Sequence, residues 1–279
     1  MMHLLWDIRV SLDLFLGGLG VGAFLVGVIL YYIDAKVYDT FVKKSFVIAP
    51  LLVIAGLLLL LTELGRPLNV IKTIYAINPT SFMSIGIFLQ SAFVAVALLI
   101  AFKVLTSGVE SLCSKIIYAG AILAGLVGLY HGFLLSGIAK EPWNNAIPVI
   151  FFVSSILSGS SLMLLLNLES LEGLIARFKL PIIINMILTL ELAAVFAWVY
   201  NLALTTASSK HAYEVLMGSF GIEFWGLSIL VGLIIPMVLL TLVILGKTSL
   251  KIVAIPTFAT MVLGSFFLKN LVVYLGQAV

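Results

Sequence analysis

Charged residues are scarce in this 279-residue sequence. Lys, Arg, Asp and Glu together make up 10% of it, and the formal net charge at pH 7 is +3. A soluble domain carries roughly 25% charged residues, so this protein lacks the polar surface that such a domain presents to water. Its 63% apolar content excludes a disordered polypeptide, and its small net charge excludes a nucleic-acid binder.

Residues that ligate metal cofactors are also scarce. The single cysteine, Cys113, supports neither an iron–sulfur cluster nor an internal disulfide. Of the three histidines, only His131 lies within a long apolar run, whereas a bis-histidine haem needs ligands on two facing helices. The sequence also lacks a phosphate-binding glycine loop that ends in Lys-Ser/Thr. We therefore expect no metal site, haem or iron–sulfur cluster in this chain.

Long, continuous apolar runs are what the sequence has instead. A helix needs about 20 such residues to cross the bilayer core, and continuous runs do not fit the alternating pattern of an outer-membrane barrel. The expected fold is an all-α integral membrane protein, a single membrane domain over 1–279 in contact with the lipid bilayer. Eight runs meet the length requirement: 11–32, 46–64, 81–105, 116–138, 147–166, 180–204, 224–245 and 250–275.

The distribution of Lys and Arg predicts the orientation. The loops after the odd-numbered runs carry nine of them and the other side carries five. By the positive-inside rule, both termini then lie outside the cytoplasm. Small residues followed by bulky ones recur at 17–25 and 155–163, both running inward. This echo suggests two four-helix bundles, at 1–138 and 139–279, although small residues are also common wherever membrane helices pack.

Several ionisable side chains fall within or at the ends of these runs, where a charge costs about 2.5 kcal/mol or more. Tyr130 adds a hydroxyl next to one of them. Counting helical turns places most of the group in the outer half of the membrane, with Glu191 near mid-depth. Hydrogen-bond donors can hold the oxygens of a quinone, and carboxylates can take up the protons that a quinol releases. The ionisable residues are Asp13, Glu63, Arg66, His131, Glu191 and Lys269.

Simpler structural roles remain open for most of these residues. Glu63 and Arg66 are three positions apart and can pair at the membrane surface. Lys269 can extend its ammonium to the interface, and His131 can be a satisfied packing residue. Glu191 is the hardest to explain in this way, because it lies too deep to reach the surface. A role in proton movement or in a buried pair is therefore favoured for Glu191.

Four segments of the sequence resemble the NrfD/polysulfide-reductase membrane-subunit family. The opening run at 12–25 resembles the family's first helix. An acidic-x-Gly-Arg-Pro turn at 63–67 is followed by Asn-Pro-x-Ser-x-Met-Ser at 78–84. A Tyr-x-Gly-hydrophobic run begins at Tyr130, and the segment at 267–277 resembles the closing helix. Together the four segments span nearly the whole sequence in the expected order.

The resemblance implies eight transmembrane helices in two four-helix bundles, with a menaquinone or other quinone bound near the outer face and no haem. Tyr130 is then a hydrogen-bond donor to the quinone, and Asp13 lies on the pocket wall. His131, Gly132 and Lys269 complete the expected quinone-binding set. Two of them depart from the family pattern, which commonly has Arg in place of Lys269 and for which we expect a small hydroxylated residue in place of His131.

The resemblance also implies partners and a proton-transfer set. Glu63 handles protons with Arg66 as its partner. Apart from the resemblance, the depth and charge of Glu191 suggest that it extends a proton path from the cytoplasmic side. An iron–sulfur subunit and a molybdopterin-type catalytic subunit, which holds the catalytic metal centre, would dock on the extracytoplasmic face of a prokaryotic cell membrane.

The expected function is that of a quinol-oxidising or quinone-reducing membrane anchor in a respiratory oxidoreductase complex. An ion or solute transporter remains an alternative because of the mid-membrane carboxylates, and so does a purely structural anchor. The terminal substrate stays open among polysulfide, tetrathionate, nitrite and others, since it belongs to the catalytic subunit.

Overall fold

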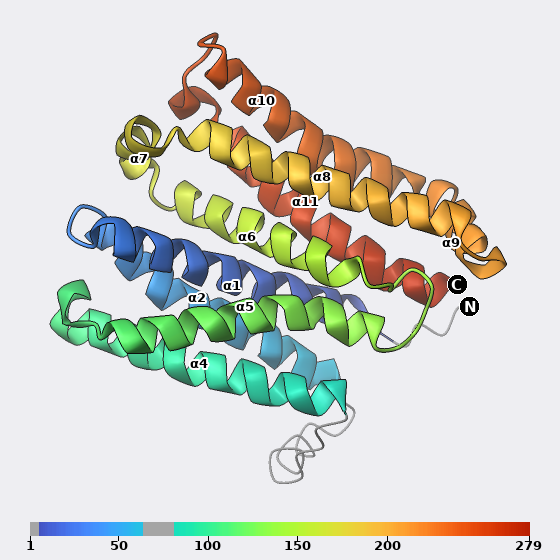
Figure 1. The fold of residues 1–279 in the computed structure, drawn as a ribbon, viewed down its shortest axis with the longest axis horizontal. Coiled ribbons are helices and arrows are strands. Elements are labelled where there is room, and N and C mark those ends of the chain that lie inside the picture. Colours follow the sequence, from blue (N-terminus) through green and yellow to red (C-terminus); the bar gives the residue numbers. More distant parts are fainter. Residues whose placement is uncertain (1–5, 64–80) are drawn as a thin grey trace.

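The computed structural model describes residues 6–63 and 81–279, and every regular element within these residues is a helix (Figure 1). Among the described residues, eight helical spans are long and apolar enough to cross a membrane, which confirms a multi-pass membrane protein. The spans agree with the eight predicted runs. They are α1 (Ile8–Asp34), α2 (Asp39–Glu63), α4 (Phe82–Ser107), α5 (Ser114–Ser136), α6 (Ile147–Leu165), α8 (Leu180–Leu204), η3 (Ile222–Ile234) continued by α10 (Ile235–Ile244), and α11 (Leu250–Ala278).

Several helices extend beyond the apolar runs, because hydropathy marks the bilayer crossing and not the helix caps. Asp7 caps α1, and its side chain accepts a hydrogen bond of 2.8 Å from the backbone N–H of Arg9. The connections also contain short helices where the sequence suggested only loops. These are η1 (Val109–Ser111), η2 (Leu168–Ser170), α7 (Leu171–Phe178) and α9 (Ala207–Met217).

The seventh span changes its winding partway along. Its first part, η3, is a π-helix, and the hydroxyl of Ser228 donates to the carbonyl of Glu223 five residues earlier at 2.9 Å. Pro236 starts the α-helical part, α10, where its missing N–H removes one backbone donor. Gly232 lies directly on Gly264 of α11, so η3 and α11 touch at their backbones.

Helices α1 and α6 form the centre of the molecule (Figure 1). Buried residues make up 67% of the apolar segment of α1 and 72% of that of α6, against 44% or less in the other spans. We call α1, α2, α4 and α5 the N-terminal half, and α6, α8, η3–α10 and α11 the C-terminal half. Helices pack within each half, but α6 also packs on α1 and α5, and α11 on α1. The division into two separate bundles stays a prediction.

At one end of the helix layer, hydrogen bonds join Trp6, which precedes α1, to Gln277 of α11. The backbone N–H of Trp6 donates to Gln277 Oε1 at 2.8 Å, and Gln277 Nε2 donates to the Trp6 carbonyl at 3.1 Å. The Trp6 ring stacks on Trp143 with ring centroids 5.4 Å apart. We call this the Trp6 end of the molecule. Whether it faces outside the cytoplasm, as the charge distribution predicts, stays a prediction.

Candidate functional site

A buried carboxyl and a buried phenol lie within electrostatic range of each other among the helices of the N-terminal half. Asp13 lies near the start of α1, and Tyr130 lies on α5; both side chains are buried and interact electrostatically. A Cβ atom placed on Gly56 of α2 would lie 2.8 Å from Asp13 Oδ1. A Cβ on Gly86 of α4 would collide with the Tyr130 hydroxyl. Both polar groups therefore rest directly on the backbones of neighbouring helices.

His131 adds an unpartnered nitrogen beside this pair. Its side chain is fully buried, and its Nε2 lies 3.0 Å from Gln90 Nε2 on α4. An amide nitrogen only donates, so His131 Nε2 accepts and the ring proton sits on Nδ1. Among the residues that the structure describes, Nδ1 has no hydrogen-bond partner. A buried donor without a partner is costly, and a ligand carbonyl oxygen at this position would satisfy it.

Lys269 reaches across the molecule and not toward its surface. Its side chain is completely buried, and its Nζ donates to Ser155 Oγ on α6 at 2.9 Å and to the Leu14 carbonyl on α1 at 3.3 Å. The Phe151 ring lies 5.7 Å from the same nitrogen. The alternative in which Lys269 extends to the interface is therefore wrong, because the aromatic ring, hydroxyl and carbonyl hold the ammonium inside.

Glu191 interacts with this ammonium from another helix. It lies on α8, is 3% exposed, and interacts electrostatically with the Ser154 hydroxyl and with Lys269. It is 13 residues from the end of α8 at Leu204, which is about 20 Å from that end at 1.5 Å per residue. The expected mid-depth position is thus consistent with the structure. Lys269 is the cation with which Glu191 interacts, but among the described residues the two form no ion pair within 4.0 Å, and the choice between proton movement and a buried pair stays a prediction.

At the Trp6 end, Arg9 joins two carboxylates. Its Nη2 lies 2.7 Å from Glu63 Oε2 and 2.7 Å from Asp7 Oδ2. Its Nη1 donates to the Thr62 carbonyl at 2.6 Å. Although burial acts to raise it, hydrogen bonds from the backbone and side chain of Arg9 and with Glu63 hold the pKa of Asp7 below its usual value. The expected partner of Glu63, Arg66, lies outside the described residues.

Gly132 has a packing role in the structure. A Cβ atom on it would collide with the backbone of Pro148 at the start of α6. Its lack of a side chain therefore allows α5 and α6 to approach closely. The residue supports the position of its neighbours Tyr130 and His131 on α5 through this contact.

Two uncharged residues of the site were missed by a search for buried charge. Gln90 fixes the His131 tautomer, and Ser155 binds the Lys269 ammonium. Gln90 could have been found from the sequence, since it is the only amide side chain in the apolar run at 81–105. Ser155 could hardly have been found in this way, because serine is common in packed membrane helices.

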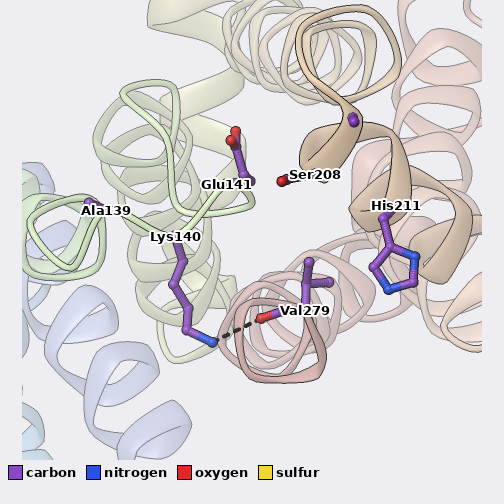
Figure 2. Close-up of a pocket in the computed structure, with 7 residues that line it drawn as sticks. Ala139, Lys140, Glu141, Ser208, His211 and Val279 are labelled. Carbon is purple, nitrogen blue, oxygen red and sulfur yellow. Dashed lines mark hydrogen bonds between the residues drawn. The ribbon is translucent and has the colours of Figure 1, made fainter.

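A surface pocket of about 690 Å³ lies away from these residues, at the Trp6 end (Figure 2). Lys140 crosses it and donates to the Val279 carbonyl oxygen at 3.0 Å. Four of its seven lining residues are polar or charged, whereas an isoprenoid tail needs apolar walls. None of the predicted site residues contributes to its wall. The lining residues are Ala139, Lys140, Glu141, Ala207, Ser208, His211 and Val279.

Comparisons with known proteins agree on one family. The family described as "Polysulphide reductase, NrfD" matches residues 1–279. The C subunit of the polysulfide reductase of Wolinella succinogenes is 32% identical over 184 residues, which cover 58% of this sequence and 58% of that protein. Protein NrfD of Escherichia coli is 28% identical over 312 aligned positions, with 98% of this sequence and 95% of that protein covered.

A third relative is named for a quinol. The Hdr-like menaquinol oxidoreductase integral membrane subunit of Archaeoglobus fulgidus is 24% identical over 151 residues. The match covers 53% of this sequence and 38% of that protein. The similarity therefore includes a membrane subunit whose name specifies menaquinol, over about half of the present protein.

Proposed function

Because the protein belongs to the NrfD (polysulphide reductase) family over its whole length, we propose that it is the quinone-reactive membrane subunit of a respiratory oxidoreductase complex. The names of two relatives, a polysulfide reductase subunit and a menaquinol oxidoreductase integral membrane subunit, support a role in such a complex. We propose menaquinone or a related quinone as the reactant. The terminal substrate would belong to the catalytic partner subunit.

The observation that carries this proposal is the buried Nδ1–H of His131, which has no hydrogen-bond partner among the described residues. The rings of His131 and Tyr130 are 6.1 Å apart between centroids, and Tyr130 interacts electrostatically with the buried Asp13. A quinone supplies reversible two-electron, two-proton chemistry when it is bound. The Tyr130 hydroxyl and the His131 N–H are donors for its oxygens, and the Asp13 carboxylate is a proton acceptor within the same region.

We propose that protons also exchange with the medium at the Trp6 end. Glu63 is joined there to Arg9 and Asp7, and its side chain is partly exposed. A carboxylate at the edge of the membrane can pass protons between a buried site and water. We keep Arg66 as a further member of this proton-transfer set. Gly132 stays in the proposed quinone-binding set as a residue that fixes α5 beside α6.

The proposed partners dock at the Trp6 end, on the extracytoplasmic side. An iron–sulfur subunit would accept electrons from the quinol, or deliver them to the quinone, and a molybdopterin-type catalytic subunit would complete the series of redox centres. The position of Asp13 supports docking at this end. Asp13 lies five residues past the start of α1, about 8 Å along the helix, so the candidate site is close to the Trp6 end.

Quinol oxidation by the purified complex tests the proposal. We expect Tyr130→Phe to lower kcat/KM for a short-chain menaquinol by about 10-fold to 100-fold, because one donor to the reacting oxygen is lost. Tyr200→Phe is the matched control, since Tyr200 lies exposed on α8, and we expect it to behave as the wild type. Organic extraction should recover quinone from the wild-type complex.

Three results would contradict the proposal in different ways. Equal activity in the two variants would remove Tyr130 from the site. An intact complex without bound quinone or quinol activity would favour the structural anchor. Solute uptake by liposomes that contain only this polypeptide would favour the transporter.

A further inference from the structure

A groove between α4 and α5 lies at the end of the molecule opposite Trp6 (Figure 1). It has a volume of about 300 Å³, and it follows the turn from α4 through η1 to α5. We call it the α4–α5 groove. It is separate from the candidate quinone site, because Lys103 in its wall is 13 residues from Gln90 along α4, about 20 Å. The lining residues are Leu99, Ile100, Phe102, Lys103, Leu112, Cys113 and Ile116.

The apolar part of the groove lies on the surface that faces lipid. Leu99 and Phe102 are 61% and 66% exposed on a membrane-spanning helix, where acyl chains would cover them. Ile100 and Leu112 are buried and form the floor. A groove with an apolar rim and an apolar floor fits a hydrocarbon chain and is a poor place for water.

The position of Lys103 matches the depth at which the headgroups of the bilayer begin. Lys103 is four residues before the end of α4 at Ser107, about 6 Å along the helix. Tyr118 is four residues past the start of α5 at Ser114, and its ring stacks on Tyr32 of α1 with centroids 5.0 Å apart. Both tyrosines are exposed, as in the aromatic belts of membrane–water interfaces. Lys103 therefore lies where a phospholipid carries its phosphate.

The charge of Lys103 has no carboxylate partner in the described part of the chain. Among residues 6–63 and 81–279, no ion pair within 4.0 Å includes Lys103 or Lys115, the second residue of α5. The carboxylate of the connection, Glu110, is paired with Lys36 at 3.2 Å. The turn thus presents two ammonium groups next to an apolar groove, and this arrangement is complementary to an anion that carries a hydrocarbon chain.

Two other apolar grooves of the described surface lack this combination. One lies on α8 and α9 between Tyr200 and Tyr213, and the other lies on η3 and α10 around Met237. Neither has a charged residue in its wall. These two grooves suit the acyl chains of any lipid, whereas the α4–α5 groove adds a cation at headgroup depth. The difference indicates a ligand with a negative headgroup.

We propose that the α4–α5 groove binds an anionic phospholipid. An acyl chain lies along Leu99 and Phe102, the phosphodiester lies against the Lys103 ammonium, and Lys115 is a second cation for the headgroup. The lipid then joins the end of α4 to the start of α5, the two helices that carry Gln90 and His131 further along. The inference does not depend on the proposed quinone chemistry.

Titration of the purified, delipidated protein in detergent tests the site. Native mass spectrometry counts the bound molecules of dioleoylphosphatidylglycerol, which is anionic, or of dioleoylphosphatidylcholine, which has the same acyl chains and no net charge. We expect the wild type to bind the first phosphatidylglycerol at least about fivefold more tightly than phosphatidylcholine. We expect Lys103→Gln to weaken phosphatidylglycerol binding about fivefold, which corresponds to the roughly 1 kcal/mol that a lysine contributes near anionic lipid.

Lys247→Gln is the matched control. Lys247 is an exposed lysine in the connection between α10 and α11, so its substitution removes the same charge away from the groove. We expect this variant to bind phosphatidylglycerol as the wild type does. Both substitutions change exposed side chains, so neither should disturb folding.

Alkylation of Cys113 locates the bound lipid. Cys113 is the only cysteine of the sequence, is exposed and lines the groove. In vesicles that contain phosphatidylglycerol, we expect N-ethylmaleimide to modify the wild type severalfold more slowly than in pure phosphatidylcholine vesicles, because the lipid covers the thiol. Lys103→Gln should lose most of this difference, and Lys247→Gln should keep it.

Three results would overturn the proposal. Equal affinity of the wild type for the two lipids would mean that the groove holds only the ordinary lipid of the bilayer. Equal weakening by the two lysine variants would mean that the general charge of this end attracts the lipid. Full displacement of phosphatidylglycerol by glycerol 3-phosphate would mean that the acyl chains make no contribution and that the groove binds a soluble phosphate.

Discussion

At the scale of single residues, the tautomer of His131 decides what the candidate site can bind. Gln90 is the group that sets it, because its amide N–H occupies Nε2 and leaves the proton on Nδ1. A donor fixed in this way is ready for a carbonyl oxygen before any ligand arrives. The sequence indicated His131 as a candidate but contained no sign of its tautomer, which depends on a residue 41 positions away.

The substitution Gln90→Leu tests the role of this amide. It removes the partner of His131 Nε2 and leaves a buried nitrogen unsatisfied, which costs about 1–3 kcal/mol of stability. Because the ring proton is then free to move to either nitrogen, we expect a higher KM for quinol and a smaller change in kcat. Steady-state kinetics and thermal unfolding in detergent measure both effects. Ser91→Ala, at an exposed position on α4, should change neither quantity.

Asp7 gives a prediction for low pH. Its pKa is lower in the folded protein than its usual value of 3.8, so the ionised form stabilises the fold at higher pH. This stabilisation is present above the usual pKa and is lost as the pH falls through the lowered one. We expect Asp7→Asn to unfold at a lower temperature than the wild type at pH 6, and the difference to shrink toward pH 3. A constant difference across this range would contradict the assignment.

At the scale of elements, the apolar runs predicted the spans well because bilayer thickness dictates their length. The same signal could not predict α7 and α9, which lie in the connections, or the π-helical winding of η3, because hydropathy does not distinguish kinds of helix. For the site, buried charge led to Asp13, His131 and Lys269. It missed the pairing of Glu63 with Arg9, because that contact depends on where α1 begins relative to the end of α2.

The packing of α1 on α6 depends on glycines of α1, and this can be tested. A Cβ on Gly22 would collide with the backbone carbonyl of Ser155 on α6, and a backbone cannot rotate aside as a side chain can. We expect Gly22→Ala to destabilise the protein by about 1–3 kcal/mol through overpacking. Gly125→Ala is the control, since nothing lies within 4 Å of its Cβ position, and it should be neutral or slightly stabilising. Thermal unfolding of the two purified variants decides the comparison.

At the scale of the whole molecule, two groups of charged side chains stand out. One lies at the Trp6 end, where Arg9 joins Asp7 and Glu63, and the other lies inside, where the buried Lys269 and Glu191 interact electrostatically. Both adjoin the central pair of helices: Arg9 lies on α1, and Lys269 lies beside α1 and α6. The two central helices therefore support the fold and also position both groups of charged side chains.

The direct contact of α1 with α6 has a mechanical consequence. Gly22 and Gly159 meet there with only backbone atoms between them, and a Cβ on Gly159 would lie 2.5 Å from the Ala23 nitrogen. A transporter that rocks one half of its fold against the other needs an interface that can slide. Helices whose main chains are in direct contact cannot slide past each other in this way. We therefore expect α1 and α6 to keep their relative position while the protein works, which argues against a transporter that rocks one half against the other.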